Sequence, residues 1–380
     1  MAKSNQVTPA QIEKMYDEGE NRVTQERSDF MLPQIRDFVV EKKWLNLRPE
    51  YQRRLVWDAK KKSRFIESLL MNIPVPPIFL YETDLNRYEV MDGQQRLNTI
   101  LEFYENNLTL EQLETWSPLN GRTYSKCPPR IQRGLDRRRI SANVLLAENI
   151  SDPKQADFIR RTVFERLNSG GQQLNHQELR NSLYSGPLND LLVELAGNRL
   201  FDEIWDIPPY EDHYRKLDGY ISPDLADNDL FKRMRDCEIV LRFFAFRDPK
   251  KIRGSVRSIL DSYMHENRDA LPPQIDELRR RFLDCLRIAH AIFGEHTFRI
   301  RDKKKKWRHS QPLFDAVMVA TEGLVTDESK LTANKHKILD SLLKAMEKQE
   351  VYEIIVGRPN TAKAIKERIS IVSRLMKQFC

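Results

Sequence analysis

Apolar positions in the first 150 residues alternate between helix-like and strand-like spacing. Apolar residues three and four apart predict helices, whereas short β-branched and aromatic runs bounded by turn residues predict strands. The expected helices begin at Pro33, span 60–72 and 95–104, and follow Pro128 and Pro129 as a short segment. The expected extended segments are 44–47, 78–81, 88–91 and 140–148. This region therefore indicates a small α/β domain.

Beyond Asn149 the apolar positions follow helical spacing alone. Residues 152–167 predict one helix, and Asn175 followed by Glu178 has the pattern of a capping box at the start of the next. The pattern predicts an α+β protein with its strands confined to the residues before Asn149. Its expected parts are a polar N-terminal arm at 1–29, a small α/β domain at 30–149 and a larger all-helical domain at 150–380.

The composition excludes several classes of protein. The chain has 380 residues, 40% of them hydrophobic and 31% charged, which is ordinary globular composition rather than a disordered or disulfide-rich one. Its four cysteines form no CxxC pair, which favours a reducing compartment. No uncharged apolar run approaches the roughly 18 residues of a membrane helix, and the charged, polar start does not resemble a secretory signal. We therefore expect a cytoplasmic protein that does not enter a membrane.

The formal net charge of +7 is concentrated in two stretches. Residues 122–139 and 299–308 each hold seven basic residues against one acidic residue. Concentrated positive charge is what a surface that faces a polyanion requires, although two solvated basic loops would have the same sequence. The candidate nucleic-acid contacts are Arg130, Arg133, Arg137, Arg138, Arg139, Lys303, Lys304, Lys305 and Lys306. They favour binding to DNA that is dominated by the phosphate backbone.

The strand predicted at 88–91 leads directly into Asp92-Gly93-Gln94-Gln95-Arg96 and a helix. Backbone N–H groups and the positive pole of a helix at such a turn form a natural phosphate site. Arg96 can hold a phosphate with two parallel hydrogen bonds, and Asp92 can hold Mg²⁺ or orient a water molecule. The alternative is an ordinary strand-to-helix turn in which Asp92 caps the helix and Arg96 lies on the surface.

Four sequence blocks together resemble one known family. DGQQR at 92–96 is preceded by PEYQRRLVWD at 49–58 and IESLLMNIPVPPIFL at 66–80, and it is followed by FERLNSGGQQLNHQELRNSLYSG at 164–186. In this order the blocks resemble the N-terminal domain of GmrSD-type restriction endonucleases, which is similar in fold to ParB and sulfiredoxin domains. The resemblance covers roughly residues 25–190. It implies a ParB/sulfiredoxin-like α/β domain that binds a nucleoside triphosphate around DGQQR.

The resemblance also assigns roles to single residues. Asp92 is expected to be a catalytic or metal-linked acid, with Gln95 and Arg96 acting beside it. The residues expected to bind the nucleotide are Gly93, Gln94, Gln52, Arg53, Trp57, Arg166 and Asn168. Simpler explanations stay open: a surface turn for Gln52 and Arg53, a core position for Trp57, a helix C-cap for Asn168, and a helix face for Glu178 and Arg180.

Two departures limit what the resemblance implies. Sulfiredoxins carry a reactive cysteine where this chain has Gln94, so thiol chemistry is excluded at that position. Restriction enzymes of this family usually carry a C-terminal HNH nuclease domain, but the seven histidines of this chain are scattered and show no metal-ligand spacing. No GxxxxGK[ST] loop is present, so the chain is not a P-loop NTPase. Nuclease activity is therefore expected from a separate chain.

The resemblance thus implies a nucleotide-binding, nucleotide-hydrolysing component of a prokaryotic restriction or antiphage system that acts with DNA or an effector partner. The alternative is a non-catalytic ParB-like DNA-binding or adaptor protein. Homo-oligomer formation is compatible with both.

Overall fold

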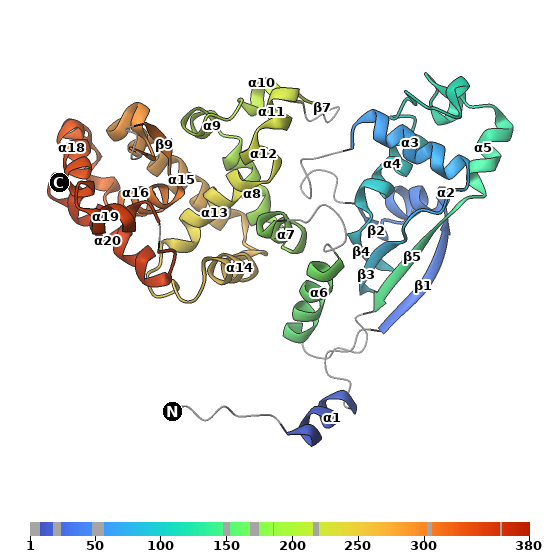
Figure 1. Cartoon of the computed structure of the whole chain (residues 1–380), viewed down its shortest axis with the longest axis horizontal. Coiled ribbons are helices and arrows are strands. Elements are labelled where there is room, and N and C mark those ends of the chain that lie inside the picture. The colour runs from blue at the N-terminus through green and yellow to red at the C-terminus, as the bar shows by residue number, and fades with distance from the viewer. Residues whose placement is uncertain are drawn as a thin grey trace. The chain divides into compact units, whose positions relative to one another are not determined.

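The chain divides into two compact units in a computed structural model. The structure describes residues 8–17, 24–47, 57–146, 153–167, 175–184, 186–215, 220–301, 306–357 and 359–380. The first unit comprises Met1–Pro49 and Val56–Gln173, and the second comprises Glu50–Leu55 and Leu174–Cys380 (Figure 1). The architecture is α+β with a larger helical part, as predicted.

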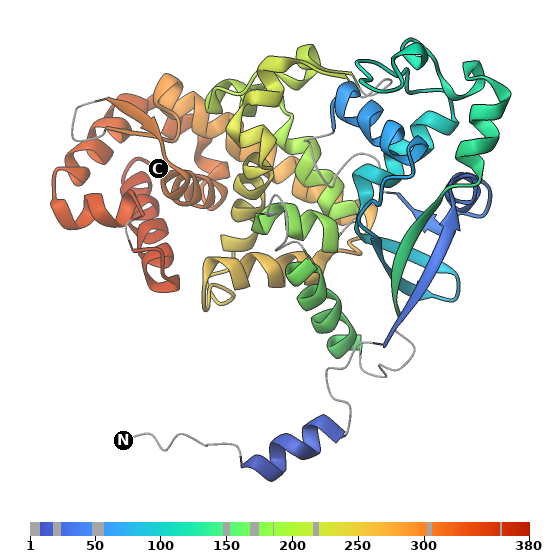
Figure 2. The ribbon, with the colours of Figure 1, turned by 45° about the vertical axis from the view of Figure 1, so that its right-hand side comes forward.

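The first unit is built on a five-stranded mixed sheet with the strand order β1-β5-β3-β4-β2. Its strands are β1 (Thr24–Met31), β2 (Leu45–Asn46), β3 (Ile78–Asp84), β4 (Arg87–Asp92) and β5 (Arg139–Leu146). The β1–β5 and β3–β4 pairs are antiparallel, whereas the β5–β3 and β4–β2 pairs are parallel. Figure 2 shows β1 in blue beside β5 in green. The predicted extended segments at 44–47, 78–81 and 88–91 are thereby confirmed as strands with shifted ends. The segment predicted at 140–148 is confirmed as far as Leu146, and residues 147 and 148 lie outside the described residues.

The polar arm predicted at 1–29 contains two regular elements that the sequence analysis does not predict. Helix α1 (Pro9–Asp17) precedes β1, and β1 itself begins at Thr24. The sequence of β1, TQERSDFM, has exposed polar residues at nearly every position, and Phe30 is half-buried. β1 lies at the edge of the sheet, and its backbone pairing with β5 supplies its hydrogen bonds. Such a strand can form without a regular alternation of apolar and polar residues.

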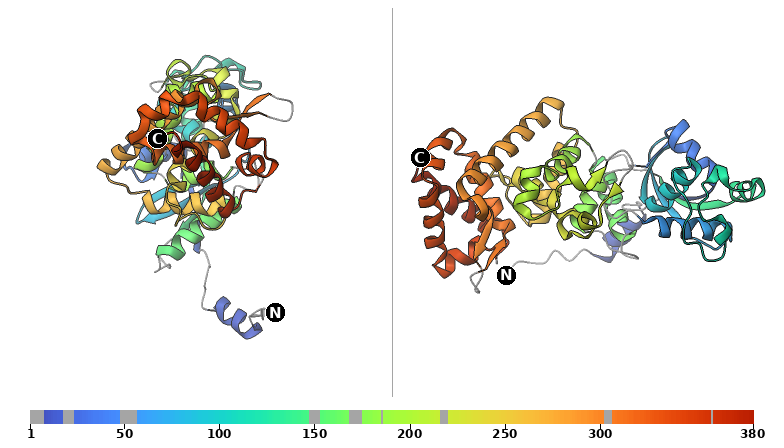
Figure 3. Two further views of the ribbon diagram at one scale, coloured as in Figure 1. Left: turned by 90° about the vertical axis from the view of Figure 1, so that its left-hand side faces the viewer. Right: turned by 90° about the horizontal axis from the view of Figure 1, so that it is seen from above.

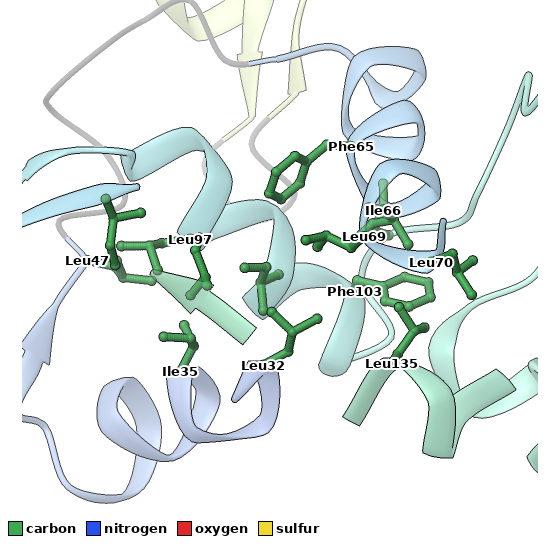
Figure 4. Packing of buried hydrophobic residues seen from close by; sticks show 14 of the residues in the cluster. Leu32, Ile35, Leu47, Phe65, Ile66, Leu69, Leu70, Leu97, Phe103 and Leu135 are labelled. Carbon is green, nitrogen blue, oxygen red and sulfur yellow. The ribbon is translucent and has the colours of Figure 1, made fainter. Parts of the chain in front are cut away.

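One face of the sheet carries the hydrophobic core of the first unit. Ile78, Leu80 and Val90 from the sheet meet apolar side chains from the helices that cover it, and these include Leu32, Leu97 and Leu135 (Figure 4). The covering helices are α2 (Leu32–Arg36), the π-helical turn Asp37–Glu41, α3 (Ala59–Leu70), α4 (Gln94–Tyr104) and α5 (Pro129–Asp136). Burial of these faces fixes the position of α4 against β3 and β4.

Helix α6 (Pro153–Leu167) covers the other face of the same sheet. Arg160 forms an ion pair of 2.7 Å with Glu89 on β4, and its guanidinium lies 5.9 Å from the ring centre of Tyr81 on β3. Because α6 packs on this sheet, the division between the units falls after Gln173 rather than at the predicted boundary of 149/150.

The second unit is built mainly of helices, coloured from green to red in Figure 3. They are α7 (His176–Leu183), α8 (Pro187–Ala196), α9 (Arg199–Trp205), α10 (Tyr210–His213), α11 (Pro223–Asp227), α12 (Asp229–Lys232), α13 (Arg235–Phe246), α14 (Val256–Asn267), α15 (Pro272–Phe293), α16 (Gln311–Glu322), α17 (Glu328–Ala333), α18 (Lys335–Met346), α19 (Gln349–Ile355) and α20 (Ala362–Lys377).

The prediction that strands are confined to the residues before Asn149 is wrong. Two short antiparallel pairs follow: β6 (Tyr214–Arg215) with β7 (Tyr220–Ile221), and β8 (Arg299–Arg301) with β9 (Trp307–His309). Strands of two or three residues are too short to show the alternation of apolar and polar positions by which strands are recognised. Apart from these two hairpins, the described residues of the second unit that form regular structure are helical, as predicted.

Candidate functional site

The candidate site is the sharp turn at which β4 ends and α4 begins. Asp92 is the last residue of β4, and α4 starts at Gln94. Gly93 between them has φ = 97°, a conformation that favours glycine. A Cβ atom at position 93 would lie 2.5 Å from Cγ2 of Ile78 on β3. Glycine therefore lets the start of the helix approach the neighbouring strand.

The first turn of α4 is not capped by the residue that precedes it. The N-cap is Gly93, which has no side chain to accept hydrogen bonds from the first N–H groups. The first N–H groups of an α-helix have no partner within the helix, and they carry the positive end of its dipole. Such a helix start can accept an anion, and the predicted phosphate site at this turn stays a prediction.

Arg96 points inward rather than lying on the surface. Its Nη2 donates to Oδ2 of Asp92 at 2.6 Å, and its Nη1 donates to the carbonyl oxygen of Pro76 at 2.5 Å. The Arg96 side chain is 10% exposed, whereas that of Asp92 is 40% exposed. This geometry gives Arg96 one definite role, which is to hold the Asp92 carboxylate at the mouth of the turn.

Gln95 connects the turn to the preceding sequence block. Its Oε1 accepts a hydrogen bond of 3.1 Å from the backbone N–H of Trp57. The half-buried Trp57 ring packs edge-on against Phe65 at 5.5 Å, and the Lys61 Nζ lies 5.2 Å from the ring centre. Trp57 is therefore both a packing residue and a neighbour of the candidate site.

The remaining predicted nucleotide-binding residues are placed as follows. Gln94 is half-buried in the first turn of α4, and Arg166 is exposed in the last turn of α6. Gln52, Arg53 and Asn168 lie outside the described residues. Their predicted roles at the site stay predictions.

The capping box predicted at Asn175 and Glu178 is present at the start of α7. The Asn175 Oδ1 accepts from the backbone N–H of Gln177 and Glu178 at 2.8 and 3.0 Å, and the Asn175 N–H donates to Oε2 of Glu178 at 2.6 Å. Arg180 is buried, and it binds Asp261 at 2.8 Å and Glu238 at 2.9 Å. Glu178 and Arg180 thus belong to the interior of the second unit.

A family model described as "GmrSD restriction endonuclease, N-terminal domain" matches residues 35–185. This stretch is therefore similar to a GmrSD-type N-terminal domain. The match extends from α2 to α7, so it contains the DGQQR turn, Trp57 and the capping box of Asn175. The domain indicates a protein of a restriction or defence system. No curated protein and no solved structure matches the chain.

Two further properties of the chain bear on its chemistry. Within the described ranges, no helix is long and apolar enough to cross a membrane. The same residues contain no group of three His, Cys, Asp or Glu side chains that could hold a metal ion. At the DGQQR turn the described residues offer one carboxylate, that of Asp92, as a metal ligand. One carboxylate can hold Mg²⁺ only together with nucleotide phosphates and water as further ligands.

The basic stretch at 122–139 forms α5 and its flanks in the first unit. Arg130, Arg133, Arg137 and Arg139 are exposed, whereas Arg138 is half-buried and donates to the carbonyl oxygen of Leu70 at 2.9 Å. In the second basic stretch Lys306 is exposed beside β9, and Lys303, Lys304 and Lys305 lie outside the described residues.

Sequence reasoning did not single out the groups that fix α5 to α4. Tyr104, at the end of α4, and Tyr124 both donate to Oδ1 of Asp136, at 3.0 and 2.8 Å. The two rings are 4.5 Å apart. These contacts join residues 12 and 32 positions apart, and no local pattern marks them.

We expect these two phenols to resist ionisation. Burial raises the pKa of Tyr104, and so does the negative charge of Asp136. Burial and the hydrogen bond to Asp136 raise the pKa of Tyr124 from 10.0 to about 12. A raised pKa means that the folded protein keeps the proton, so this stabilisation is complete below pH 10 and is lost as the pH rises toward the folded values.

Urea unfolding measured at intervals between pH 9 and pH 12 checks this expectation. Tyr104→Phe should make the loss of stability with rising pH less steep, because one proton fewer separates the folded and unfolded states. An unchanged pH dependence would mean that Tyr104 ionises as easily in the folded protein as in the unfolded chain.

Proposed function

We propose that the chain is a component of a prokaryotic restriction or antiphage system that binds and hydrolyses a nucleoside triphosphate at the DGQQR turn. One observation carries this proposal. A half-exposed carboxylate, Asp92, is held by Arg96 directly beside a helix start that has no side-chain cap. An acceptor-rich phosphate chain suits the helix start, and a fixed carboxylate beside it suits the activation of water.

Each residue of the turn has a distinct part in this proposal. Gly93 allows the close turn, and the first N–H groups of α4 donate to phosphate oxygens. Gln94 and Gln95 supply side-chain amides, and Gln95 also holds the backbone at Trp57. Arg96 keeps Asp92 oriented toward the attacking water. Mg²⁺ bound with the nucleotide would neutralise phosphate charge, with Asp92 as its ligand from the protein.

DNA and a separate effector chain complete the proposed system. The exposed arginines of α5 support DNA as a partner. A separate nuclease chain accords with the scattered histidines of the sequence.

A second candidate function is a non-catalytic adaptor of ParB-like fold. The inward orientation of Arg96 favours it, because protein groups already occupy two of its nitrogens. Such an adaptor would use DGQQR as a structural turn, or would bind nucleotide without turnover.

Phosphate release from each of the common nucleoside triphosphates, with Mg²⁺ and with or without DNA, tests the proposal. We expect Asp92→Asn to lower turnover by about 10²–10⁴-fold, which is typical for loss of a positioned acid–base group, while calorimetric affinity changes far less. The matched control is Glu105→Gln, which removes an exposed acid at the other end of α4.

The outcomes separate the two candidate functions. Binding without phosphate release would favour the adaptor, and a folded chain that binds no triphosphate would overturn both the site and its chemistry. Equal losses in Asp92→Asn and Glu105→Gln would show that charge alone, and not the position of Asp92, matters.

A further inference from the structure

Helix α5 has two clearly different faces. Leu135 is fully buried in the core of the first unit (Figure 4), and the half-buried Ile131 packs against that core. Arg130, Arg133 and Arg137 are exposed. Their spacing of three and then four residues places them in one stripe, about 10 Å long at 1.5 Å per residue. We call these three residues the α5 stripe.

The α5 stripe is not neutralised by the protein itself. Within the described residues, none of its three guanidinium groups lies within 4.0 Å of a carboxylate, and the same is true of Arg139. The acid of this helix, Asp136, faces Tyr104 and Tyr124. Many other arginines of the chain are paired, such as Arg64 with Glu114. The positive charge of the stripe is therefore available to a ligand.

Gly134 is half-buried and lies beside the stripe, between it and the core-facing side of α5. Glycine is the least favourable residue in a helix interior after proline, so it needs a reason. The φ angle of Gly134 is not positive, and an added Cβ atom would meet nothing within 4 Å. The fold of the chain therefore does not require glycine here. A glycine among exposed arginines does allow another molecule to approach the helix backbone closely.

The α5 stripe is held on a rigid support. Gln132 donates from Nε2 to the carbonyl oxygens of Tyr124 and Cys127 at 3.1 and 2.8 Å. Asp136 accepts from the two tyrosines at the far end of the helix. Rigid mounting lowers the entropic cost of presenting several charges together.

We propose that Arg130, Arg133, Gly134 and Arg137 form a docking surface for the sugar–phosphate backbone of duplex DNA. This inference rests on the restriction-system role proposed above. The three guanidinium groups bind successive phosphates, and Gly134 lets the strand approach the helix backbone beside them. Contacts of this kind position a protein on DNA without reading its sequence. Recognition of particular bases or modifications lies elsewhere in the system.

Two other classes of polyanion fit the surface less well. A helix that binds a membrane inserts an apolar face into the lipid, but the apolar face of α5 is buried in the core. Acidic protein partners are bound at interfaces with an apolar centre. The exposed large apolar residues of the described chain are Met31, Met71, Ile73, Leu85, Phe158 and Leu271, and none of them lies on α5.

Fluorescence anisotropy of a labelled 20-bp duplex tests the proposal with the full chain and no nucleotide. Between 50 and 200 mM NaCl, the logarithm of the affinity should fall linearly with the logarithm of the salt concentration. The variant Arg130→Gln/Arg133→Gln/Arg137→Gln should flatten the slope by about 0.9 for each lost phosphate contact, or about 2.7 for all three. Arg253→Gln/Arg280→Gln/Arg374→Gln removes the same charge from exposed positions of the second unit and should leave the slope unchanged.

Gly134→Ala gives a second measurement that does not depend on charge. Alanine is the better helix former, so the variant should unfold at a higher temperature. If a DNA strand approaches the helix at Gly134, this more stable variant should nevertheless bind the duplex several-fold more weakly.

Several results would overturn the proposal. They are equal salt slopes for the wild type and the stripe variant, full duplex affinity in Gly134→Ala, and tighter binding of polyglutamate or phosphatidylserine vesicles than of duplex. Phosphate release without DNA should stay at the wild-type level in the stripe variant, so a failure here is distinguishable from a failure of the DGQQR site.

Discussion

Replacement of Asp315 by asparagine is expected to destabilise the second unit by about 3–5 kcal/mol, the usual cost of breaking a buried ion pair. Asp315 lies on α16 and is fully buried. Arg242 on α13 binds both of its oxygens, at 2.8 and 2.5 Å. Arg368 on α20 is also fully buried, and its Nη1 lies 3.8 Å from Oδ2 of Asp315. One carboxylate thus serves two arginines from two different helices.

The cost follows from the charge balance of this cluster. Burial lowers the pKa of Arg368, and Asp315 partly offsets that effect. Nη2 of Arg368 donates to the carbonyl oxygen of Pro359 at 3.0 Å, whereas Nε and Nη1 have no hydrogen-bond partner among the described residues. The charge of the guanidinium therefore depends on the nearby Asp315 carboxylate for its compensation. Without the carboxylate, two desolvated cations would face each other in a low-dielectric interior.

A double-mutant cycle measured by urea unfolding checks this explanation. Arg368→Met leaves one cation and one anion in the cluster, so it should cost much less than Asp315→Asn or even stabilise the protein. Asp315→Asn should also cost less in the Arg368→Met background than in the wild type, because only one cation then loses its partner. Equal and additive losses would show that packing, and not charge balance, governs this cluster.

The parts of the fold that sequence predicts well are determined by neighbouring residues. The capping box of Asn175 and Glu178 needs contacts over three positions only, and it is present as predicted. The start of α4 after Gly93 is similarly local, because the strand end, the glycine and the apolar helix pattern lie within a dozen residues. Such patterns are readable because each residue acts on its own backbone or on the next turn.

The parts that sequence does not predict depend on distant partners. The orientation of Arg96 is determined by the carbonyl of Pro76, 20 residues earlier, and nothing local distinguishes an inward from an outward arginine. The polar strand β1 exists because β5, more than 100 residues later, pairs with it. The position of α6 on the sheet likewise depends on Arg160 meeting Glu89. A one-dimensional pattern contains none of these pairings.

Replacement of Gly93 by alanine is expected to be severely destabilising and to abolish nucleotide binding. The φ angle of 97° is costly for any residue with a side chain, by roughly 1–2 kcal/mol. The new methyl group would also overlap Ile78, and overpacking in a well-filled core costs about 1–3 kcal/mol more. The turn can relieve this overlap only by moving α4 away from β3, which displaces the N–H groups proposed to bind phosphate.

Gly121→Ala is the matched control for backbone strain. Gly121 has a φ angle of 80°, and a Cβ atom there would meet nothing within 4 Å. Thermal or urea unfolding of the two variants therefore separates the conformational cost from the contacts of the new Cβ atom, which are with Ile78 and, at 3.1 Å, with Nη2 of Arg96. We expect Gly93→Ala to be the more destabilised by about the overpacking cost, roughly 1–3 kcal/mol.

Substitutions at Ile78 then identify the atom responsible. Ile78→Ala removes Cγ2, so in combination with Gly93→Ala it should cost less than the sum of the single changes. Ile78→Val keeps Cγ2 and should give no such relief. If both combinations are additive, the requirement for glycine does not come from β3. If the first recovers stability but not triphosphate binding in calorimetry, the amides of the turn need the original backbone path as well as the space that glycine leaves.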